Sequence, residues 1–303
     1  MEKLYNNKYI KVSKIGGGSF GAVYLVKDKE TEKLYAMKKY YLDNLGKGGA
    51  KKQYEILSKF NHENIHKVID MFISQNKNQY LITPYFKNNL YDYVSKKLPE
   101  KVIKQIIYQI LCGVNYLHSL KYLHRDIKPD NILLSSEGKI ILTDFDLCRQ
   151  ESKGKDDPMT RTAVTLYYRA PEIFFGDSYY GNKIDIWSIG CVFAELVIGK
   201  PIFKANNELG TLSNIIENIG CPNEDNWPGV SKLPNYLPFG GGEFKLGKTL
   251  KEGGLSIDGI NMVTKMLMLD PKKRPTCEEM IKNDYFKKDI ATPEELKTIM
   301  NLK

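Results

Sequence analysis

The pattern of apolar residues changes near Pro84, and this change restricts the chain to few folds. Before Pro84, short apolar runs rich in β-forming residues predict strands over residues 8–15, 22–28, 34–40, 66–73 and 79–83. Helical spacing predicts one helix there, over residues 50–60. After Pro84 it predicts helices over residues 102–118, 184–199, 209–220 and 257–269. The sequence therefore predicts an α+β protein in which a small β-rich part precedes a larger helical part.

Composition and charge exclude several classes of protein. The 303 residues suffice for one large domain or for two lobes, and 42% apolar with 27% charged residues is ordinary for a globular protein. The net charge of +9 comes from lysines spread along the chain, so we expect a solvated surface and no nucleic-acid partner. The longest apolar passage, residues 184–198, contains two acidic residues and is too short to span a bilayer. We expect no membrane association.

The cysteines predict neither a zinc site nor a disulfide framework. All five are scattered, their number is odd, and none forms a C-x-x-C pair. The N-terminus lacks the apolar stretch of a signal peptide. We therefore expect reduced thiols in a cytoplasmic or nuclear protein, or one found in both compartments.

A glycine cluster lies between the first two predicted strands. Residues 15–23 read Ile-Gly-Gly-Gly-Ser-Phe-Gly-Ala-Val, in which Gly16, Gly18 and Gly21 form G-x-G-x-x-G. Glycine lets backbone N–H groups approach phosphate oxygens closely. A plain glycine-rich hairpin would show the same pattern, and a dinucleotide-binding fold would need a helix directly after it. Because a strand follows instead, the cluster favours a loop folded over a nucleotide.

The third predicted strand presents a lysine beside this loop. It contains Tyr35-Ala36-Met37-Lys38. Since side chains alternate along a strand, Leu34, Ala36 and Lys38 share one face. This weakens the alternative that Lys38 is an ordinary surface lysine.

Two further motifs contain residue types that suit phosphoryl transfer. The first is residues 124–131, His-Arg-Asp-Ile-Lys-Pro-Asp-Asn, and the second is residues 143–145, Thr-Asp-Phe. Phosphoryl transfer needs positioning and neutralisation of charge. Asp126 would accept or orient the proton of a hydroxyl, and Lys128 would steady the charge of the transferred group. Asn131 and Asp144 offer oxygen ligands of the kind that Mg²⁺ prefers.

With these motifs the chain resembles the protein kinase family along nearly its whole length. The resemblance implies one bilobal kinase domain over residues 1–303, with an N-lobe about 1–84, a hinge about 84–89, a C-lobe about 90–286 and a short tail 287–303. It implies that ATP and Mg²⁺ are the cofactors, and Lys128 resembles the serine/threonine kinases. The residues that it assigns to ATP are Ile15, Gly16, Gly18, Gly21, Val23, Ala36, Lys38, Pro84, Phe86 and Leu133.

Other segments resemble the cyclin-dependent kinases, namely residues 165–172, 185–191, 226–236 and 269–275. This branch implies a buried Glu172–Arg274 ion pair, support of the catalytic loop by Asp185, and activating phosphorylation of Thr160. It also implies a cyclin or other activating subunit, a role in cell-cycle or transcription control, and protein substrates with Ser-Pro or Thr-Pro sites. Ser19 matches a phosphorylatable position in the glycine loop.

The chain departs from the family pattern at three places. Gln53 stands where the family has a glutamate that pairs with the lysine matched by Lys38, and we expect Gln53 to hydrogen-bond Lys38 without supplying charge. Asp146 stands where the family has glycine. The cyclin-recognition sequence of the family is missing around Gln53. A pseudokinase scaffold would explain these changes, but the presence of Lys38, Asp126, Asn131 and Asp144 favours an active kinase.

Overall fold

A computed structural model describes residues 4–41, 49–152, 154, 156–160, 165–242 and 244–302. The chain divides into two compact units. The first comprises Met1–Lys87 and Thr143–Asp146, and the second comprises Asn88–Leu142 and Leu147–Lys303. The first unit therefore includes a four-residue segment that is distant in the sequence and contains the predicted metal ligand Asp144.

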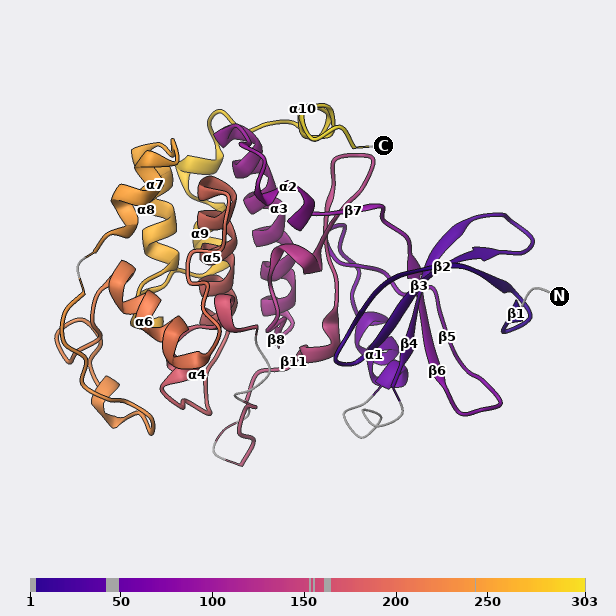
Figure 1. The fold of residues 1–303 in the computed structure, drawn as a ribbon, viewed down its shortest axis with the longest axis horizontal. Helices are drawn as coiled ribbons and strands as arrows, with labels where there is room; N and C mark the ends of the chain where they lie inside the picture. The colour runs from indigo at the N-terminus through magenta and orange to yellow at the C-terminus, as the bar shows by residue number, and fades with distance from the viewer. Residues whose placement is uncertain are drawn as a thin grey trace. The chain divides into compact units, whose positions relative to one another are not determined.

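An antiparallel sheet with the strand order β1-β2-β3-β4-β6-β5 forms most of the first unit (Figure 1). Its strands are β1 (Leu4–Tyr5), β2 (Tyr9–Gly18), β3 (Gly21–Asp28), β4 (Leu34–Tyr40), β5 (Asp70–Ile73) and β6 (Gln79–Pro84). Helix α1 (Gly49–Leu57) packs against β5 and β6. The predicted strands and helix are present, but β5 is shorter than the strand expected over residues 66–73, since its pairing with β6 begins only at Asp70.

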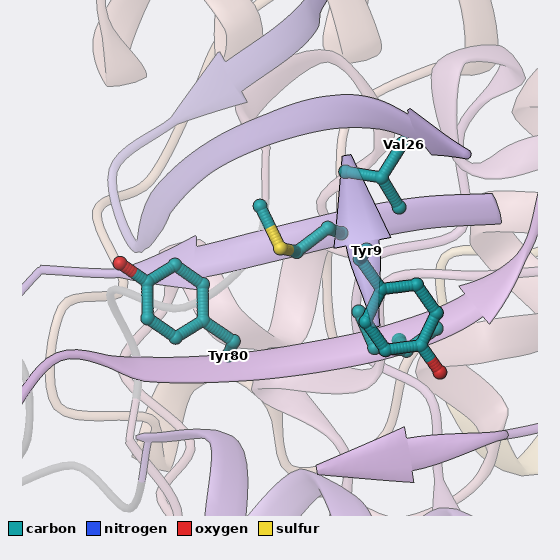
Figure 2. Close-up of a cluster of buried hydrophobic side chains, with 5 residues drawn as sticks. Tyr9, Val26 and Tyr80 are labelled. Atoms are coloured by element: carbon teal, nitrogen blue, oxygen red, sulfur yellow. The ribbon is translucent and has the colours of Figure 1, made fainter. Parts of the chain in front are cut away.

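A cluster of large side chains forms the core of this sheet. It contains Tyr9, Val26, Met37, Tyr80 and Ile82, of which Figure 2 labels Tyr9, Val26 and Tyr80, on strands β2, β3 and β6 of this sheet. The ring of Phe72 stacks on both tyrosines. Because Met37 belongs to this core, strand alternation turns its neighbour Lys38 to the opposite face of β4.

The second unit is mainly helical. Its longer helices are α3 (Glu100–Ser119), α5 (Lys183–Ile198), α6 (Glu208–Ile219), α7 (Leu246–Glu252) and α8 (Ile257–Met266). In Figure 1 α3 and α5 run side by side, and both pack against further helices. Nearly every residue of α5 is buried, as its apolar sequence predicts. None of the helices in the described part of the chain has the length and apolarity to cross a membrane.

Short strands bracket the motifs of the second unit. One small sheet has the order β10-β9-β7, from Ile140–Leu142, Ile132–Leu134 and Asn88–Asn89. Another pairs β8 (Tyr122–Leu123) with β11 (Arg149–Gln150). Residues 124–131 lie between β8 and β9, so both ends of this loop are fixed by strand pairing.

The segment expected to be a tail belongs to the second unit and is packed within it. It contains helix α10 (Pro293–Ile299), which starts with a capping box between Thr292 and Glu295 and buries Leu296. A Cβ atom on Gly138 would lie only 2.1 Å from the carbonyl oxygen of Pro293. The other short helices are α2 (Tyr91–Val94), α4 (Pro171–Phe174) and α9 (Cys277–Ile281).

Candidate functional site

A buried carboxylate supports the loop that contains Asp126. Asp185, in the first turn of α5, accepts the backbone N–H of His124 at 3.0 Å and that of Arg125 at 2.9 Å. The ring of His118 lies 2.8 Å from the same carboxylate. Burial alone would raise the pKa of Asp185, but the hydrogen bond and charge of His118, with the Arg125 amide, lower it. The support expected from the resemblance is therefore present.

The backbone of this loop is strained at Arg125. This residue has a φ of 67°, a left-handed conformation that residues other than glycine seldom adopt. The hydrogen bond from its amide to Asp185 holds it there. Such strain persists only where surrounding contacts over-determine it, and it is common at functional sites. It sets the direction in which the next residue, Asp126, leaves the backbone.

Three side chains converge on the carboxylate of Asp126. Oδ2 accepts hydrogen bonds from the Nζ of Lys128 and the Nδ2 of Asn131, each at 2.8 Å. Oδ1 accepts one from the hydroxyl of Thr165 at 2.8 Å. The structure thus brings Asp126, Lys128 and Asn131 together.

Sequence reasoning did not identify Thr165 as part of this cluster. Its hydroxyl also accepts a hydrogen bond from Lys128 at 2.9 Å, so it bridges the ammonium and the carboxylate. Thr165 shows that Oδ1 of Asp126 can accept a hydroxyl hydrogen at normal distance. Only its place in the motif of residues 165–172 could have indicated this role, because 39 residues separate it from Asp126.

The two residues that the resemblance assigns to Mg²⁺ are Asn131 in the second unit and Asp144 in the first. Among the described residues the Asn131 side chain bonds through Nδ2, to the backbone and side-chain oxygens of Asp126, so its Oδ1 could serve as a ligand. Asp144 supplies a carboxylate that is one-third exposed. Among the described residues no group of three or more His, Cys, Asp or Glu side chains could hold a metal by itself.

In the first unit, Lys38 pairs with two carboxylates. Its Nζ lies 2.8 Å from Oδ1 of Asp144 and also bonds Oδ2 of Asp146. Burial would lower the pKa of Lys38, but the two carboxylates raise it. Lys38 therefore remains an ammonium ion over the physiological pH range.

Asp146 is the more buried of these carboxylates. Its Oδ1 accepts a hydrogen bond from the hydroxyl of Tyr40 at 3.0 Å, a contact that the sequence did not predict. Burial raises the pKa of Asp146 to about 6, against the opposing charge of Lys38. Replacing glycine by aspartate introduces no left-handed strain here, because within this segment Asp144, with a φ of 60°, and not Asp146 is left-handed.

The expectation that Gln53 hydrogen-bonds Lys38 is wrong. The Nε2 of Gln53 instead donates to the backbone carbonyl of Phe145 at 2.8 Å, and the side chain is buried. Lys38 is occupied by the two aspartates, which a neutral amide does not displace because charge-assisted bonds are stronger. Glu55, two residues further on, is exposed, as helix geometry predicts.

The three glycines of the loop differ in their surroundings. A Cβ atom on Gly21 would lie 2.1 Å from the carbonyl oxygen of Lys39, so β3 and β4 require glycine there. A Cβ atom on Gly18 would meet no described atom within 4 Å, and one on Gly16 would meet, among the described atoms, only the Val23 side chain, at 3.9 Å. These two positions leave the backbone open to a ligand. Of the other residues assigned here, Ile15 and Ser19 are exposed, whereas Val23 and Ala36 are half-buried.

A buried histidine binds the segment that was assigned to adenine. The Nε2 of His66 lies 3.0 Å from the carbonyl oxygen of Pro84, and its Nδ1 lies 2.8 Å from the hydroxyl of Thr143. The ring also contacts Phe86, with the centroids 5.5 Å apart. A carbonyl oxygen has two lone pairs, and the contact with His66 uses one of those on Pro84. Leu133, assigned to ATP as well, is half-buried in β9 of the second unit.

This histidine predicts a pH dependence of stability. Burial lowers the pKa of His66 from 6.5 to about 4. The unfolded chain therefore binds a proton at His66 before the folded chain does, and stability is lost as pH falls below about 6.5. Between about pH 7.5 and pH 5 we expect this histidine to remove about 2 kcal/mol from the free energy of unfolding. Urea unfolding of the wild type and of His66→Gln at both pH values measures the difference. Equal pH dependence in the two proteins would contradict the assignment.

Thr160 lies next to an arginine. Its Oγ1 accepts a hydrogen bond from Nη1 of Arg125 at 3.1 Å, and its carbonyl accepts one from the hydroxyl of Tyr180 at 2.6 Å. Arg149 pairs with Asp157 in the same segment. The resemblance matches Arg125, Arg149 and Lys52 to the three basic residues that bind the activating phosphate in the family, and Lys52 is exposed on α1 in the first unit. Residues 161–164 lie outside the described part of the chain.

The ion pair expected between Glu172 and Arg274 is present and fully buried. Nη1 and Nη2 of Arg274 each lie 2.7 Å from one oxygen of Glu172. The remaining donors of the guanidinium bond the carbonyls of Met268, Lys183 and Leu269. The nitrogens of this buried guanidinium thus all donate hydrogen bonds, and the ion pair fixes α4 to the loop after α8.

Comparison with known proteins agrees with this geometry. The family model described as "Protein kinase domain" matches residues 9–286. The cyclin-dependent kinase C-1 of Oryza sativa subsp. japonica is 34% identical to this chain over an alignment of 303 residues in length. The alignment covers 92% of this chain and 58% of that protein. The chain thus spans little more than half the length of this relative.

Proposed function

The chain belongs to the protein kinase family and is a cyclin-dependent kinase-like member of it. We propose that it transfers the γ-phosphate of ATP to serine or threonine hydroxyls of proteins. The observation that supports this best is the hydrogen bond from the hydroxyl of Thr165 to Oδ1 of Asp126. A substrate hydroxyl that replaced it would be oriented for attack with its proton directed at a carboxylate.

The other residues of the cluster act on charge. Lys128, held by Asp126 and Thr165, would neutralise charge that develops on the transferred phosphoryl group. Asn131 fixes the second oxygen of Asp126 and so its orientation. Lys38 would bind phosphate oxygens of the nucleotide.

Members of this family use ATP and Mg²⁺, and the residues present fit both. Asn131 and Asp144 would hold the cation through oxygen, and the cation would neutralise phosphate charge. The open backbone at Gly16 and Gly18 would receive the phosphates. The family pattern assigns Ile15, Val23, Ala36 and Leu133 to the base. Pro84 and Phe86 would bond adenine through their backbone groups.

An active enzyme accounts for the departures better than a pseudokinase scaffold does. Gln53 leaves Lys38 without its usual partner, but Asp144 and Asp146 provide negative charge. All four residues that contribute to the chemistry are present. A γ-phosphate transfer assay distinguishes the two alternatives, since a scaffold would bind nucleotide without turnover.

We expect a preference for proline after the target residue. In the cyclin-dependent kinases the segment matching residues 164–169 offers no acceptor to the N–H of the following residue, and proline has none. Tyr167 replaces the tryptophan that this branch usually has, and Val164 lies outside the described residues. An unsatisfied N–H costs about 1–3 kcal/mol, so Ser-Pro peptides should exceed matched Ser-Ala peptides in kcat/KM by about 10- to 100-fold. Equal values for the two peptides would contradict this preference.

Phosphorylation of Thr160 should raise activity. A phosphate on its Oγ1 would place a charge of about −2 beside the guanidinium of Arg125, which already donates a hydrogen bond to this oxygen. If the phosphate forms one charge-assisted hydrogen bond, the kinase activity should increase by about tenfold or more. Activity is measured before and after phosphatase treatment of protein that mass spectrometry shows to be phosphorylated at this site. Phosphatase should leave Thr160→Ala unchanged, and equal activity of phosphorylated wild type and Thr160→Ala would refute the role.

We also propose an activating partner and a cellular location. A cyclin or another subunit would act on this chain as on other cyclin-dependent kinases, in control of the cell cycle or of transcription, and mass spectrometry of co-purifying chains tests this.

Five free cysteines are consistent with the cytoplasm, the nucleus or both, which fractionation of cells would test. Ser19, exposed in the glycine loop, is a candidate site of inhibitory phosphorylation, because phosphate there would repel ATP.

A further inference from the structure

The first unit has exchanged two residue types relative to the family pattern. Position 53 on α1 has lost a negative charge, and position 146 has gained one. In the family the lysine matched by Lys38 pairs with the glutamate of this helix. Here Lys38 pairs with Asp144 and Asp146, which lie two residues apart in one segment.

The two aspartates differ in how firmly they are held. The side chain of Asp146 is 5% exposed, whereas that of Asp144 is 33% exposed. One oxygen of Asp146 binds the lysine and the other accepts the hydroxyl of buried Tyr40. With both oxygens engaged, Asp146 has one fixed orientation, and so does the ammonium group bonded to it.

Gln53 secures the backbone on which Asp146 lies. Its amide donates to the carbonyl of Phe145, the residue directly before Asp146. The ring of Phe145 also contacts that of Phe60, with the centroids 5.9 Å apart. Helix α1 thus fixes the segment through a neutral hydrogen bond, and the negative charge comes from the segment itself.

We propose that Asp146 is the positioning residue that holds Lys38 for the phosphates of ATP, in place of a glutamate on α1. This inference rests on the proposed kinase function. Asp144 is the weaker anchor, because its more exposed carboxylate gives Lys38 only Oδ1 and would share its charge with the cation that it is proposed to bind. Asp146 keeps Lys38 paired while Asp144 binds the cation.

The test compares three variants at this position and its neighbour. Asp146→Asn removes the charge, Asp146→Glu keeps it, and Tyr40→Phe removes only the hydrogen bond to Asp146. In steady-state kinetics Asp146→Asn should lower kcat by about 10- to 100-fold, the loss expected for one charge-assisted bond, with little change in the KM for ATP. Asp146→Glu and Tyr40→Phe should stay closer to the wild type.

A second measurement does not depend on activity. Acetylation of Lys38 by an N-hydroxysuccinimide ester, followed by mass spectrometry, reports how firmly its ammonium is paired, because only the neutral amine reacts. Asp146→Asn should raise the rate of Lys38 acetylation several-fold, while buried Lys104 serves as internal reference and stays unchanged. A wild type without phosphotransfer would overturn the proposed function, yet the labelling would still test the ion pair. Equal labelling and equal kcat in Asp146→Asn and the wild type would overturn the inference, as would equal effects of Asp146→Asn and Asp146→Glu.

Discussion

Asp126→Asn is expected to lower phosphotransfer by about 10²- to 10⁴-fold, the usual contribution of a positioned general base. The amide has nearly the shape of the carboxylate, so it should still contact Asn131 and Thr165. It cannot accept a proton from the substrate hydroxyl and offers one acceptor oxygen instead of two. The measurement is kcat with a peptide substrate at saturating ATP, together with the affinity for ATP and the melting temperature, which should change little.

Asp130→Asn is the matched control for this change. Asp130 lies in the same loop, only four residues away, but its side chain is exposed. Its substitution should leave kcat within about twofold of the wild type, as is usual for surface positions. Near-normal turnover of Asp126→Asn, or an equal loss in both variants, would contradict the assignment of Asp126.

Glu172→Gln should produce the largest loss of stability. It removes one partner of a fully buried pair and leaves the charge of Arg274 uncompensated. Breaking such a pair costs about 3–5 kcal/mol, even though the intact pair contributes far less. Urea unfolding should show a lower midpoint at an unchanged dependence on denaturant.

An exposed ion pair provides the contrast. Glu278 and Lys282 form a pair one helical turn apart, and both side chains are largely exposed. Glu278→Gln should cost about 0.5 kcal/mol or less. If the two substitutions destabilised the protein equally, burial would not be the reason for the effect at Glu172.

Much of the fold could be predicted because periodicity and burial are local properties of the sequence. The helix expected over residues 184–199 is observed as Lys183–Ile198, and the strand expected over 34–40 matches β4. The packing of the segment after residue 286 was not predicted, since neither its capping box nor its contact with Gly138 produces a long apolar pattern.

The motif residues could be predicted, but several of their partners could not. Asp126, Lys128 and Asn131 lie within six positions of one another, whereas Thr165 approaches Asp126 from 39 residues away. The choice of partner for Lys38 was decided by competition between charged and neutral acceptors, which needs three-dimensional positions. For this reason Gln53 was assigned to the wrong partner, although its burial on α1 follows from helix geometry.

Transfer of radiolabelled phosphate from γ-labelled ATP to protein is the most direct test of the central claim. The chain, purified with any co-purifying subunits, is incubated with Mg²⁺-ATP and a Ser-Pro peptide, beside Lys38→Met as the control that retains the core. We expect label on serine in the wild type and almost none with Lys38→Met, since this lysine serves the phosphates and not the fold. Nucleotide binding without transfer above that control, in protein phosphorylated at Thr160, would contradict it and identify a pseudokinase scaffold.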